Sequence, residues 1–212
     1  SKAAMLTYSK VFGYQPRSGM RNRPCSIAAL ALEYQDLHMQ LEEWTAIIAH
    51  LYIELAPKAA EVHRKRTADK IKEEYHLAKS MFTSGIINKT NQLPYHFDRG
   101  NFEKAWSAML GIKKWITGGH LVIPEYDVAL EISDGSMCLF DGQAHIHGVT
   151  PIKKLNPKGE RYTIVWYSLE QMWQCLTSKE ELEVINKKMT TQAIRKSERG
   201  NDTEAWEDYQ DR

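Results

Sequence analysis

The chain has 212 residues, of which 28 are Lys or Arg and 27 are Asp or Glu, so its formal net charge is +1. Hydrophobic residues make up 42% and charged residues 26%, which excludes wholesale disorder and fits one domain carrying a helical extension. The near-zero net charge excludes a protein that holds nucleic acid by bulk charge alone, although it permits a local basic groove.

Membrane insertion and disulfide bonding are both unexpected from the sequence. The longest uncharged apolar run, residues 44–53, is far shorter than the roughly 20 residues that a membrane span needs. The first twenty residues contain no apolar export segment. The cysteines at positions 25, 138 and 175 form no CxxC pair, so we expect neither a disulfide framework nor a thiolate zinc site. These features predict an intracellular protein, nuclear in a eukaryote and cytoplasmic in a bacterial or viral host.

The first part of the chain, about residues 1–79, is predicted to form a mainly helical layer. Ser26 is a candidate helix N-cap, and apolar residues recur at helical spacing through residues 27–51. A second and more polar helix is expected to run from Pro57 to about Lys72. It carries a basic run at residues 63–66, which a solvated helix face explains.

The next part, about residues 80–175, is predicted to be a small antiparallel β-fold. Turn signals about every ten residues separate short stretches rich in Val, Ile and Leu, which is typical of a sandwich or barrel. The best hairpin signal is Asp134-Gly135, which lies between two such stretches. The five predicted strands are Leu121–Ile123, Val128–Ile132, Met137–Phe140, His145–Val149 and Arg161–Ser168.

The chain as a whole is therefore predicted to be α+β. No internal repeat and no Pro-rich or Gly-rich linker divides it, so residues 1–194 are expected to form one domain. Residues 195–212 are almost entirely polar and are expected to be a frayed tail or a loose helix.

The most informative histidine is His96, because it precedes Asp98 in the sequence His96-Phe97-Asp98. In an extended segment, residues two apart point to the same side, so an imidazole nitrogen and a carboxylate oxygen converge on one point. These are two of the three ligands of the facial triad that holds non-haem Fe(II). A turn with a polar pair explains an isolated HxD triplet more simply, so a third ligand is needed.

The third ligand has two candidates, His145 and His147, which lie two residues apart on one predicted strand face. Arg161 opens the next strand, and an arginine at the mouth of a β-barrel can clamp a dicarboxylate through two parallel hydrogen bonds. Thr163 lies two residues further on and can donate its hydroxyl to the same carboxylate. An HxD pair, a distal histidine and an arginine in the strand-rich half together favour an iron site over coincidence.

Further motifs extend this combination over roughly residues 10–175. They are Phe12-Gly13-Tyr14-Gln15-Pro16-Arg17, Phe82-Thr83-Ser84-Gly85-Ile86-Ile87-Asn88, His96-Phe97-Asp98-Arg99-Gly100-Asn101, Gly118-Gly119-His120-Leu121-Val122-Ile123-Pro124-Glu125-Tyr126, Leu139-Phe140-Asp141, His147-Gly148-Val149-Thr150-Pro151 and Arg161-Tyr162-Thr163. With these motifs the sequence resembles the Fe(II)/2-oxoglutarate-dependent dioxygenases. The HxDxxN form and the Gly-Gly…Leu-Val-Ile-Pro-Glu-Tyr block make it look most like the TET/JBP family of 5-methylpyrimidine oxidases, in a small single-domain form.

The resemblance implies a double-stranded β-helix (jelly-roll) core, Fe(II) as the metal, and 2-oxoglutarate and O2 as co-substrates. The implied iron ligands are His96, Asp98 and His147, and the implied 2-oxoglutarate contacts are Arg161, Thr163, Asn101 and Arg17. The implied substrate contacts are Asn101, Asn88, Thr83 and His145. His147 is preferred over His145 as a ligand because His-Gly-x-Thr-Pro is the form found in the family.

The resemblance further implies a DNA substrate whose methylated base is flipped into the pocket. The target is then 5-methylcytosine, oxidised to 5-hydroxymethylcytosine and further, or thymine, oxidised to 5-hydroxymethyluracil. Tyr126 or Phe102 is a candidate platform for stacking of that base. Candidate phosphate contacts are Arg17, Arg21, Arg23, Lys113, Lys114 and residues 64–66. No membrane and no obligate protein partner is expected.

Two other interpretations remain open at this point. One is a hydroxylase with the same iron chemistry that acts on a protein side chain or a small metabolite, which a substrate screen distinguishes. The other is a non-catalytic jelly-roll binding module whose histidine-rich face is structural. That interpretation predicts no Fe(II) binding and no loss of function when His96 or Asp98 is changed to Ala.

Overall fold

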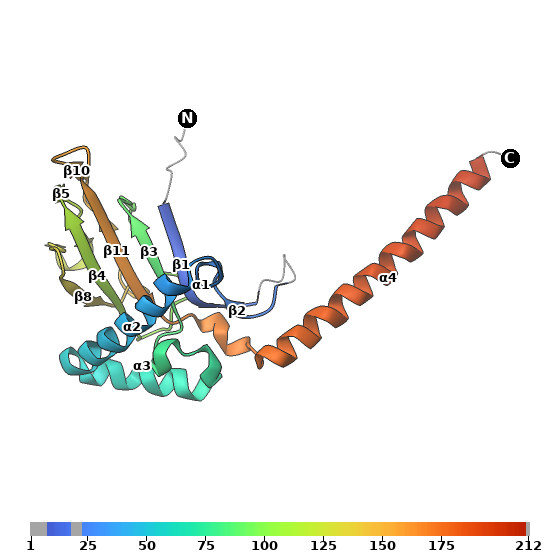
Figure 1. Ribbon diagram of the computed structural model, residues 1–212, viewed down its shortest axis with the longest axis horizontal. Coiled ribbons are helices and arrows are strands. Elements are labelled where there is room, and N and C mark those ends of the chain that lie inside the picture. Colours follow the sequence, from blue (N-terminus) through green and yellow to red (C-terminus); the bar gives the residue numbers. More distant parts are fainter. Residues whose placement is uncertain (1–7, 18–22, 211–212) are drawn as a thin grey trace.

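The computed structural model describes residues 8–17 and 23–210, with side chains as far as residue 196. Its body combines antiparallel sheets with helices that pack at one side of them, and one long helix extends away from this body (Figure 1). None of the described helices carries an apolar stretch of the length and hydropathy that a bilayer crossing requires.

The largest sheet has six antiparallel strands drawn from distant parts of the chain. In spatial order they are β2 (Ser26–Ile27), β1 (Tyr8–Gln15), β3 (Ser84–Lys89), β11 (Glu160–Tyr167), β4 (Ser107–Lys114) and β8 (Met137–Phe140). Asn88 on β3 pairs directly with Ser9 on β1 and with Thr163 on β11. Directly paired residues present their side chains to the same face, so these three polar residues form one row across the sheet.

Two smaller antiparallel sheets complete the β-fold. They contain β7 (Val128–Leu130), β6 (Leu121–Ile123) and β9 (Gly148–Val149) in the first, and β10 (Ile152–Lys154) and β5 (Ile116–Gly118) in the second. A buried cluster joins the first of them to the large sheet, with Leu121 and Ile123 from β6 packing against Met109 of β4 and Phe140 of β8. Two antiparallel sheets that enclose side chains between them are the arrangement of the predicted jelly-roll.

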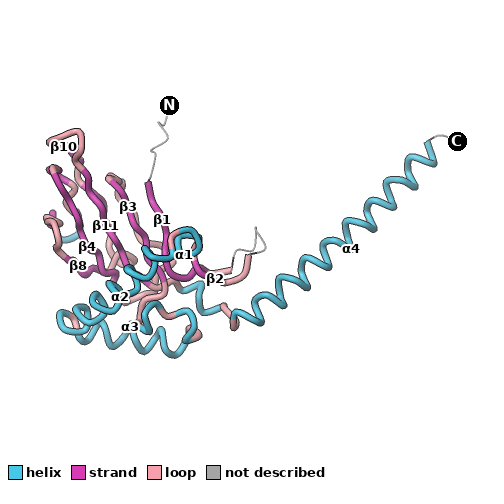
Figure 2. Tube along the Cα trace, in the orientation of Figure 1, coloured by secondary structure: helices cyan, strands magenta, loops and turns pink. Residues whose placement is uncertain are grey.

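The helices gather at one side of the strands, apart from the last one (Figure 2). They are α1 (Ala29–Glu33), α2 (Gln35–Leu55), α3 (Pro57–Lys70) and α4 (Ser178–Gln210), with 3-10 turns η1 (Glu73–Tyr75), η2 (Leu77–Lys79), η3 (Pro124–Tyr126) and η4 (Glu170–Gln174). Pro57 occupies the first turn of α3, where its missing N–H costs no intrahelical hydrogen bond. Thr177 and Glu180 cap the start of α4 reciprocally, through hydrogen bonds from the Glu180 N–H to Thr177 Oγ1 and from the Thr177 N–H to Glu180 Oε2.

The main core lies between the helices and the large sheet. Trp166 of β11 is fully buried and makes an edge-to-face contact with Phe12 of β1. Its indole N–H donates to the Thr45 hydroxyl at 2.8 Å, so this ring fixes α2 against the sheet through both apolar and polar contacts. Burying a ring of this size contributes on the order of 3 kcal/mol or more to folding.

The predicted elements are confirmed in part. Residues 121–123 and 137–140 form strands with the predicted bounds, and α2 and α3 lie where helices were expected. Strands β1 and β2 fall inside the part predicted to be mainly helical, so the prediction was wrong for these two segments. Ser26 pairs with Gln15 in a two-residue strand instead of capping a helix. Four further strands, β3, β4, β5 and β10, were not predicted.

The hairpin expected at Asp134-Gly135 is also wrong, because the flanking strands β7 and β8 belong to different sheets. The turn is instead fixed to β4, where the Asp134 carboxylate accepts from the Lys113 N–H and the Gly135 N–H donates to the Gly111 carbonyl. The polar tail is the end of one continuous helix, α4, which begins at Ser178 and so crosses the expected domain boundary at residue 195.

A disulfide bond joins Cys25 to Cys175, against the expectation that the cysteines form no disulfide. The two residues are 150 positions apart, and no local spacing pattern signals a pair at that separation. The bond links the segment before β2 to the end of η4. Cys138 is a free thiol whose pKa burial raises.

His63 of α3 is a buried histidine held in its neutral form. Its Nε2–H donates to the Ser168 hydroxyl at 2.8 Å, since that hydroxyl itself donates to the Met81 carbonyl. The ring is surrounded by Tyr52 and Phe82 and is 1% exposed. Burial, and to a lesser extent the charge of Arg66, lowers the pKa of His63 to about 3.

We predict that His63 makes the fold sensitive to mild acid. The unfolded chain protonates this side chain near pH 6.5 and the folded chain only near pH 3, so stability is fully present above pH 6.5 and falls as the pH drops toward 3. The expected loss is roughly 1 kcal/mol per pH unit in this window. Urea denaturation between pH 6 and 4.5 measures it. The variant His63→Gln should show a shallower pH slope, and equal slopes would contradict the prediction.

Candidate functional site

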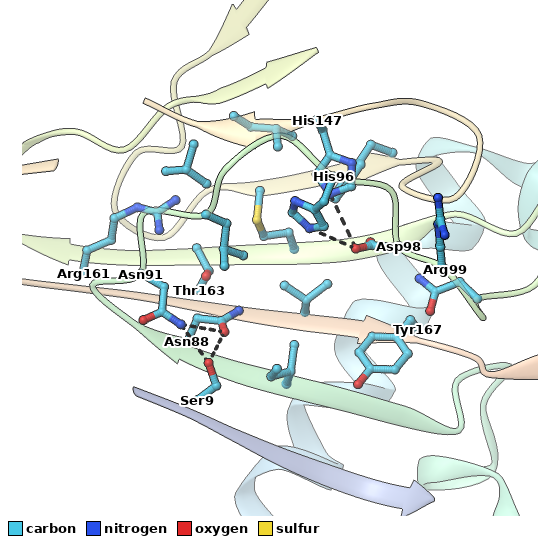
Figure 3. A pocket seen from close by; sticks show the side chains of 18 of the residues that line it. Ser9, Asn88, Asn91, His96, Asp98, Arg99, His147, Arg161, Thr163 and Tyr167 are labelled. Atoms are coloured by element: carbon cyan, nitrogen blue, oxygen red, sulfur yellow. Dashed lines mark hydrogen bonds and ion pairs between the residues drawn. The ribbon is translucent and has the colours of Figure 1, made fainter. Parts of the chain in front are cut away.

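A cavity of about 440 Å³ lies between the large sheet and the sheet formed by β6, β7 and β9. Residues of β3, β4, β6, β9 and β11 line it, together with the loop at residues 91–101 that follows β3. Figure 3 shows that its polar side chains form two groups, with His96, His147 and Asp98 toward one side and Arg161, Thr163 and Asn88 toward the other.

The three predicted iron ligands converge at one point of this cavity. Nε2 of His96 lies 3.4 Å and Nε2 of His147 lies 3.6 Å from Oδ1 of Asp98. One ligand atom from each residue can be chosen so that all three lie within 4.8 Å of one another. Two imidazoles and one carboxylate at this separation match the facial triad of non-haem Fe(II) sites.

A short backbone bridge brings the two histidines together. The His96 N–H donates to the His147 carbonyl at 2.9 Å, and the His147 N–H donates to the His96 carbonyl at 3.0 Å. As a directly opposed antiparallel pair, the two residues present their side chains on one side. Their ring centroids are 4.4 Å apart.

The far nitrogen of each ring is held by a main-chain carbonyl. Nδ1 of His96 lies 2.8 Å from the Pro94 carbonyl, and Nδ1 of His147 lies 3.0 Å from the His145 carbonyl. Each carbonyl accepts from Nδ1–H, which directs Nε2 of both rings toward Asp98 and fixes the tautomer that a metal requires. The donor set therefore fits a divalent iron ion.

Electrostatics at this point also suit a cation. Burial raises the pKa of the Asp98 carboxyl, but the interaction with the neighbouring His147 and His96 rings outweighs burial and holds that pKa well below its usual range. The interaction with Asp98 in turn raises the pKa of His96. Asp98 is thus an anion near neutral pH, as a metal ligand must be.

Gly142 leaves the room that the Asp98 carboxylate occupies. A Cβ added at residue 142 would overlap Oδ2 of Asp98. The Gly142 carbonyl also accepts from the Asp98 N–H at 2.8 Å, so this segment supports both the backbone and the side chain of the ligand.

Arg161 lies at the other side of the cavity, where its charge has no carboxylate partner among the described residues. The side chain is buried, with the residue 3% exposed, and its Nη2 donates to the Gly119 carbonyl at 2.9 Å. Burial lowers the pKa of Arg161, although a guanidinium keeps its charge at any ordinary pH. A Cβ at Gly119 would come within 2.7 Å of Arg161 Nε. A buried, unpaired guanidinium facing a cavity is suited to bind a carboxylate.

Thr163, Asn88 and Asn101 also line the cavity, as the sequence predicted. Thr163 and Asn88 lie beside each other near Arg161 (Figure 3). Nδ2 of Asn101 donates to the Ser107 hydroxyl at 3.3 Å.

Three predicted site residues do not reach the cavity. Arg17 binds Glu181 instead, with Nε donating to Oε2 at 2.9 Å and Nη2 to Oε1 at 2.5 Å. Thr83 is fully buried and does not line the cavity, and its hydroxyl lies 3.0 Å from Ser84 Oγ. His145 lies in a turn rather than on the strand face of His147. Its ring pairs with Glu125 at 2.5 Å and with the Tyr126 hydroxyl at 3.0 Å.

The aromatic and basic candidates for nucleic-acid contact are also placed elsewhere. Phe102 is fully buried in a core cluster with Tyr75 and Met172, so it offers no stacking face. Tyr126 is exposed and bonded to His145, as described above. Lys113 pairs with Glu131, Lys114 lies 4.3 Å over the Trp115 ring, and Arg66 donates to the Glu103 carbonyl. Arg23 and Arg64 are exposed, and Arg21 lies outside the described residues.

Four polar residues of the cavity were missed by the sequence analysis: Ser9, Asn91, Arg99 and Tyr167. Tyr167 had a usable signal, because it continues the alternation of Arg161, Thr163 and Val165 along one strand face. Burial, and then the charge of Asp98, raises the pKa of Tyr167 to about 12, so its phenol is protonated. Ser9 had no usable signal in the sequence, because the segment that contains it was expected to be helical.

Residues 10–170 match the protein family Tet_JBP, described as the oxygenase domain of the 2OGFeDO superfamily. The chain belongs to this family. Its superfamily is that of the 2-oxoglutarate- and Fe(II)-dependent dioxygenases, so membership confirms the predicted family resemblance and enzyme class.

Curated relatives of this oxygenase include the bifunctional helicase and thymine dioxygenase JBP2 of two kinetoplastids. The Trypanosoma cruzi protein is 25% identical over 153 residues, which cover 72% of this chain and 14% of that protein. The Leishmania major protein is 26% identical over 144 residues, which cover 68% of this chain and 13% of that protein. The chain therefore spans about a seventh of the length of these relatives.

Among solved structures, NgTET1 in complex with 5mC DNA aligns with a TM-score of 0.63. The sequences are 15% identical, and the alignment covers 84% of this chain and 69% of that one. At this identity the likeness establishes the fold, and it confirms the predicted double-stranded β-helix with its helical layer.

We predict that Gly142→Ala weakens metal binding by displacing the Asp98 carboxylate. Supporting groups of this kind typically change metal affinity 10- to 100-fold, and we expect a loss of about that size. Titration with Mn(II) or Fe(II) under anaerobic conditions measures it. Gly135→Ala is the control, because a Cβ there meets nothing within 4 Å and only the turn is strained. Unchanged metal affinity in Gly142→Ala would show that Asp98 adapts or is not a ligand.

Proposed function

We propose that this oxygenase hydroxylates the methyl group of a 5-methylpyrimidine in DNA, using Fe(II), 2-oxoglutarate and O2. The observation that carries the proposal is the convergence of His96, Asp98 and His147 in one cavity with the unpaired guanidinium of Arg161. Membership of the TET/JBP oxygenases supports DNA as the substrate, because the matched relatives are named thymine dioxygenases and NgTET1 was solved with 5mC DNA.

In this proposal His96, Asp98 and His147 hold the iron, and Arg161 with Thr163 holds the distal carboxylate of 2-oxoglutarate. When bound, the iron would let O2 act as the four-electron oxidant: two electrons come from 2-oxoglutarate, which becomes succinate and CO2, and two from the methyl C–H bond, which becomes C–OH. The protein orients both reactants and keeps water from the cavity. Its apolar walls, including Leu121, serve the last purpose.

The base itself is proposed to occupy the side of the cavity lined by Asn101, Tyr167 and Arg99. Asn101 offers both a donor and an acceptor to a base edge, as hydrogen-bond reading of a pyrimidine requires. Tyr167 offers a ring face. Arg99 is exposed and has no acidic partner among the described residues, so it is placed to meet a phosphate.

The remaining expectations accompany this proposal. We infer an intracellular protein that acts on DNA inside the cell. Residues 1–194 are proposed as one oxygenase unit, with the distal part of α4 outside it.

We predict that the protein converts 5-methylcytosine or thymine in DNA to the 5-hydroxymethyl base and that Asp98→Ala abolishes the conversion. Loss of the carboxylate ligand should lower turnover by several orders of magnitude, because the iron then lacks its anionic ligand. Nucleoside mass spectrometry after incubation with Fe(II), ascorbate, 2-oxoglutarate and air measures the product and identifies the base.

The control is Glu183→Ala, a change of similar size on an exposed position of α4. Succinate formation without an oxidised base would move the substrate to proteins or small metabolites. Retention of full activity by Asp98→Ala would show that Asp98 is not an iron ligand. A native protein that binds no Fe(II) and forms neither succinate nor an oxidised base would favour a binding module.

A further inference from the structure

Three polar side chains at the Arg161 side of the cavity form a closed hydrogen-bond circuit that the proposed chemistry does not yet use (Figure 3). The Ser9 hydroxyl donates to Asn88 Oδ1 at 2.7 Å. Nδ2 of Asn91 donates to Ser9 Oγ at 2.8 Å and to Asn88 Oδ1 at 3.3 Å. Asn88 and Asn91 are 7% and 4% exposed, so both amides are largely removed from bulk water, whereas Ser9 is an exposed residue at the edge of the circuit.

These hydrogen bonds determine whether the oxygen or the NH2 group of the Asn88 amide remains available to a ligand. Its Oδ1 receives two hydrogen bonds, one from Ser9 and one from Asn91, so its NH2 group is the part left for a ligand. If the Asn88 amide alone were turned over, its NH2 would face the NH2 of Asn91, donor against donor. A side-chain NH2 group donates two hydrogen bonds and accepts none.

The free NH2 group lies among other donors. Asn88 pairs directly with Thr163 across β3 and β11, and Arg161 is two residues before Thr163 on the same face. Directly opposed side chains in a sheet start about 5 Å apart, within reach of one small ligand. A guanidinium, a hydroxyl and an amide NH2 therefore share one buried end of the cavity.

A donor-rich surface of this kind matches a ligand that only accepts hydrogen bonds, and an ionised carboxylate is such a ligand. The edge of a pyrimidine carries donors as well as acceptors, so it fits this surface less well. Asn101, whose amide is restrained through one donor only, remains available for a base edge.

We propose that Asn88, oriented by Ser9 and Asn91, donates a hydrogen bond to the distal carboxylate of 2-oxoglutarate beside Arg161 and Thr163. The assignment rests on the proposed function and changes the role expected for Asn88, from contact with the base to contact with the co-substrate. Ser9 and Asn91 are positioning residues, because they act through the Asn88 amide. Strand β1 thereby takes part in co-substrate selection.

The decisive variant is Asn88→Asp. Aspartate keeps an oxygen that can accept from Ser9 and Asn91, so the circuit survives, but it presents a second oxygen where the NH2 group stood. The test is calorimetric titration of the Mn(II)-loaded full chain with 2-oxoglutarate and with 2-oxovalerate, which has the same carbon chain and no distal carboxylate. Asn186→Asp, the same chemical change on an exposed position of α4, is the control.

We expect Asn88→Asp to weaken binding of 2-oxoglutarate on the order of 100-fold, because a charge-assisted hydrogen bond is replaced by repulsion between two carboxylates. Binding of 2-oxovalerate should change by less than about threefold, since that ligand does not reach Asn88 through a charged group. The control should bind both keto acids as the native protein does.

Ser9 is tested by Ser9→Ala and Ser9→Thr. Removing the hydroxyl frees the Asn88 amide to rotate, and we expect a loss of about fivefold for 2-oxoglutarate and none for 2-oxovalerate. Threonine keeps the hydroxyl and should restore the affinity. A structural role alone would not produce a loss confined to the dicarboxylate, and Mn(II) affinity should be the same in all three proteins.

Two results would overturn the proposal. An equal loss of both keto acids in Asn88→Asp would place Asn88 at the metal-binding end of the ligand. Unchanged affinity for 2-oxoglutarate with lost oxidation of DNA would make Asn88 a base contact. If Asn88→Asp does not fold, as judged by circular dichroism, Asn88→Ala replaces it, with an expected loss of about 10-fold confined to 2-oxoglutarate.

A failure of the proposed function can be told apart from a failure of the Asn88 assignment. A native protein that binds 2-oxoglutarate through Asn88 but oxidises no base in DNA would leave this assignment in place and remove the DNA substrate. A native protein that binds neither keto acid would overturn the assignment itself.

Discussion

The two-residue backbone bridge between His96 and His147 is the constraint on which the site depends. Each residue donates to and accepts from the other, at 2.9 and 3.0 Å, which joins a loop after β3 to the start of β9. Because opposed residues of an antiparallel pair present their side chains together, the bridge sets both imidazoles on one side. The Asp98 side chain then points to the same side as His96, because the two residues are two positions apart in an extended segment. The positions of the three proposed ligands therefore depend on two main-chain hydrogen bonds.

The remainder of the cavity shows how polar groups are tolerated between two sheets. Burying a charge without a partner is costly, and among the described residues the buried Arg161 side chain has only the Gly119 carbonyl as an acceptor. The Asn88 Oδ1 accepts two hydrogen bonds, while its NH2 group has no acceptor within the described part of the chain. An anion bound as proposed would satisfy both groups, so the desolvation that costs stability without a ligand would strengthen binding of a dicarboxylate.

Sequence reasoning located the parts of the site that are encoded locally. His96 and Asp98 are two residues apart on one segment, and Arg161 and Thr163 share a strand face, so simple alternation identifies each pair. It did not locate Ser9, because its neighbours across the sheet come from residues far along the chain and strand register is not written in any short segment. The placement of Arg17 at the co-substrate site was not predictable for a similar reason. Its partner Glu181 is 164 positions away, and no residue near Arg17 in the sequence indicates that ion pair.

Two glycines beside the cavity, Gly142 and Gly119, carry a different kind of information from the histidines. A side chain at Gly142 would occupy the space of the Asp98 carboxylate, and one at Gly119 would press on the guanidinium of Arg161. Gly119 also has a φ of +71°, a conformation that other residues adopt only with strain. Neither glycine has a side chain. Each instead sets how closely the backbone approaches Asp98 or Arg161, so the geometry of the proposed site depends partly on the absence of these two side chains.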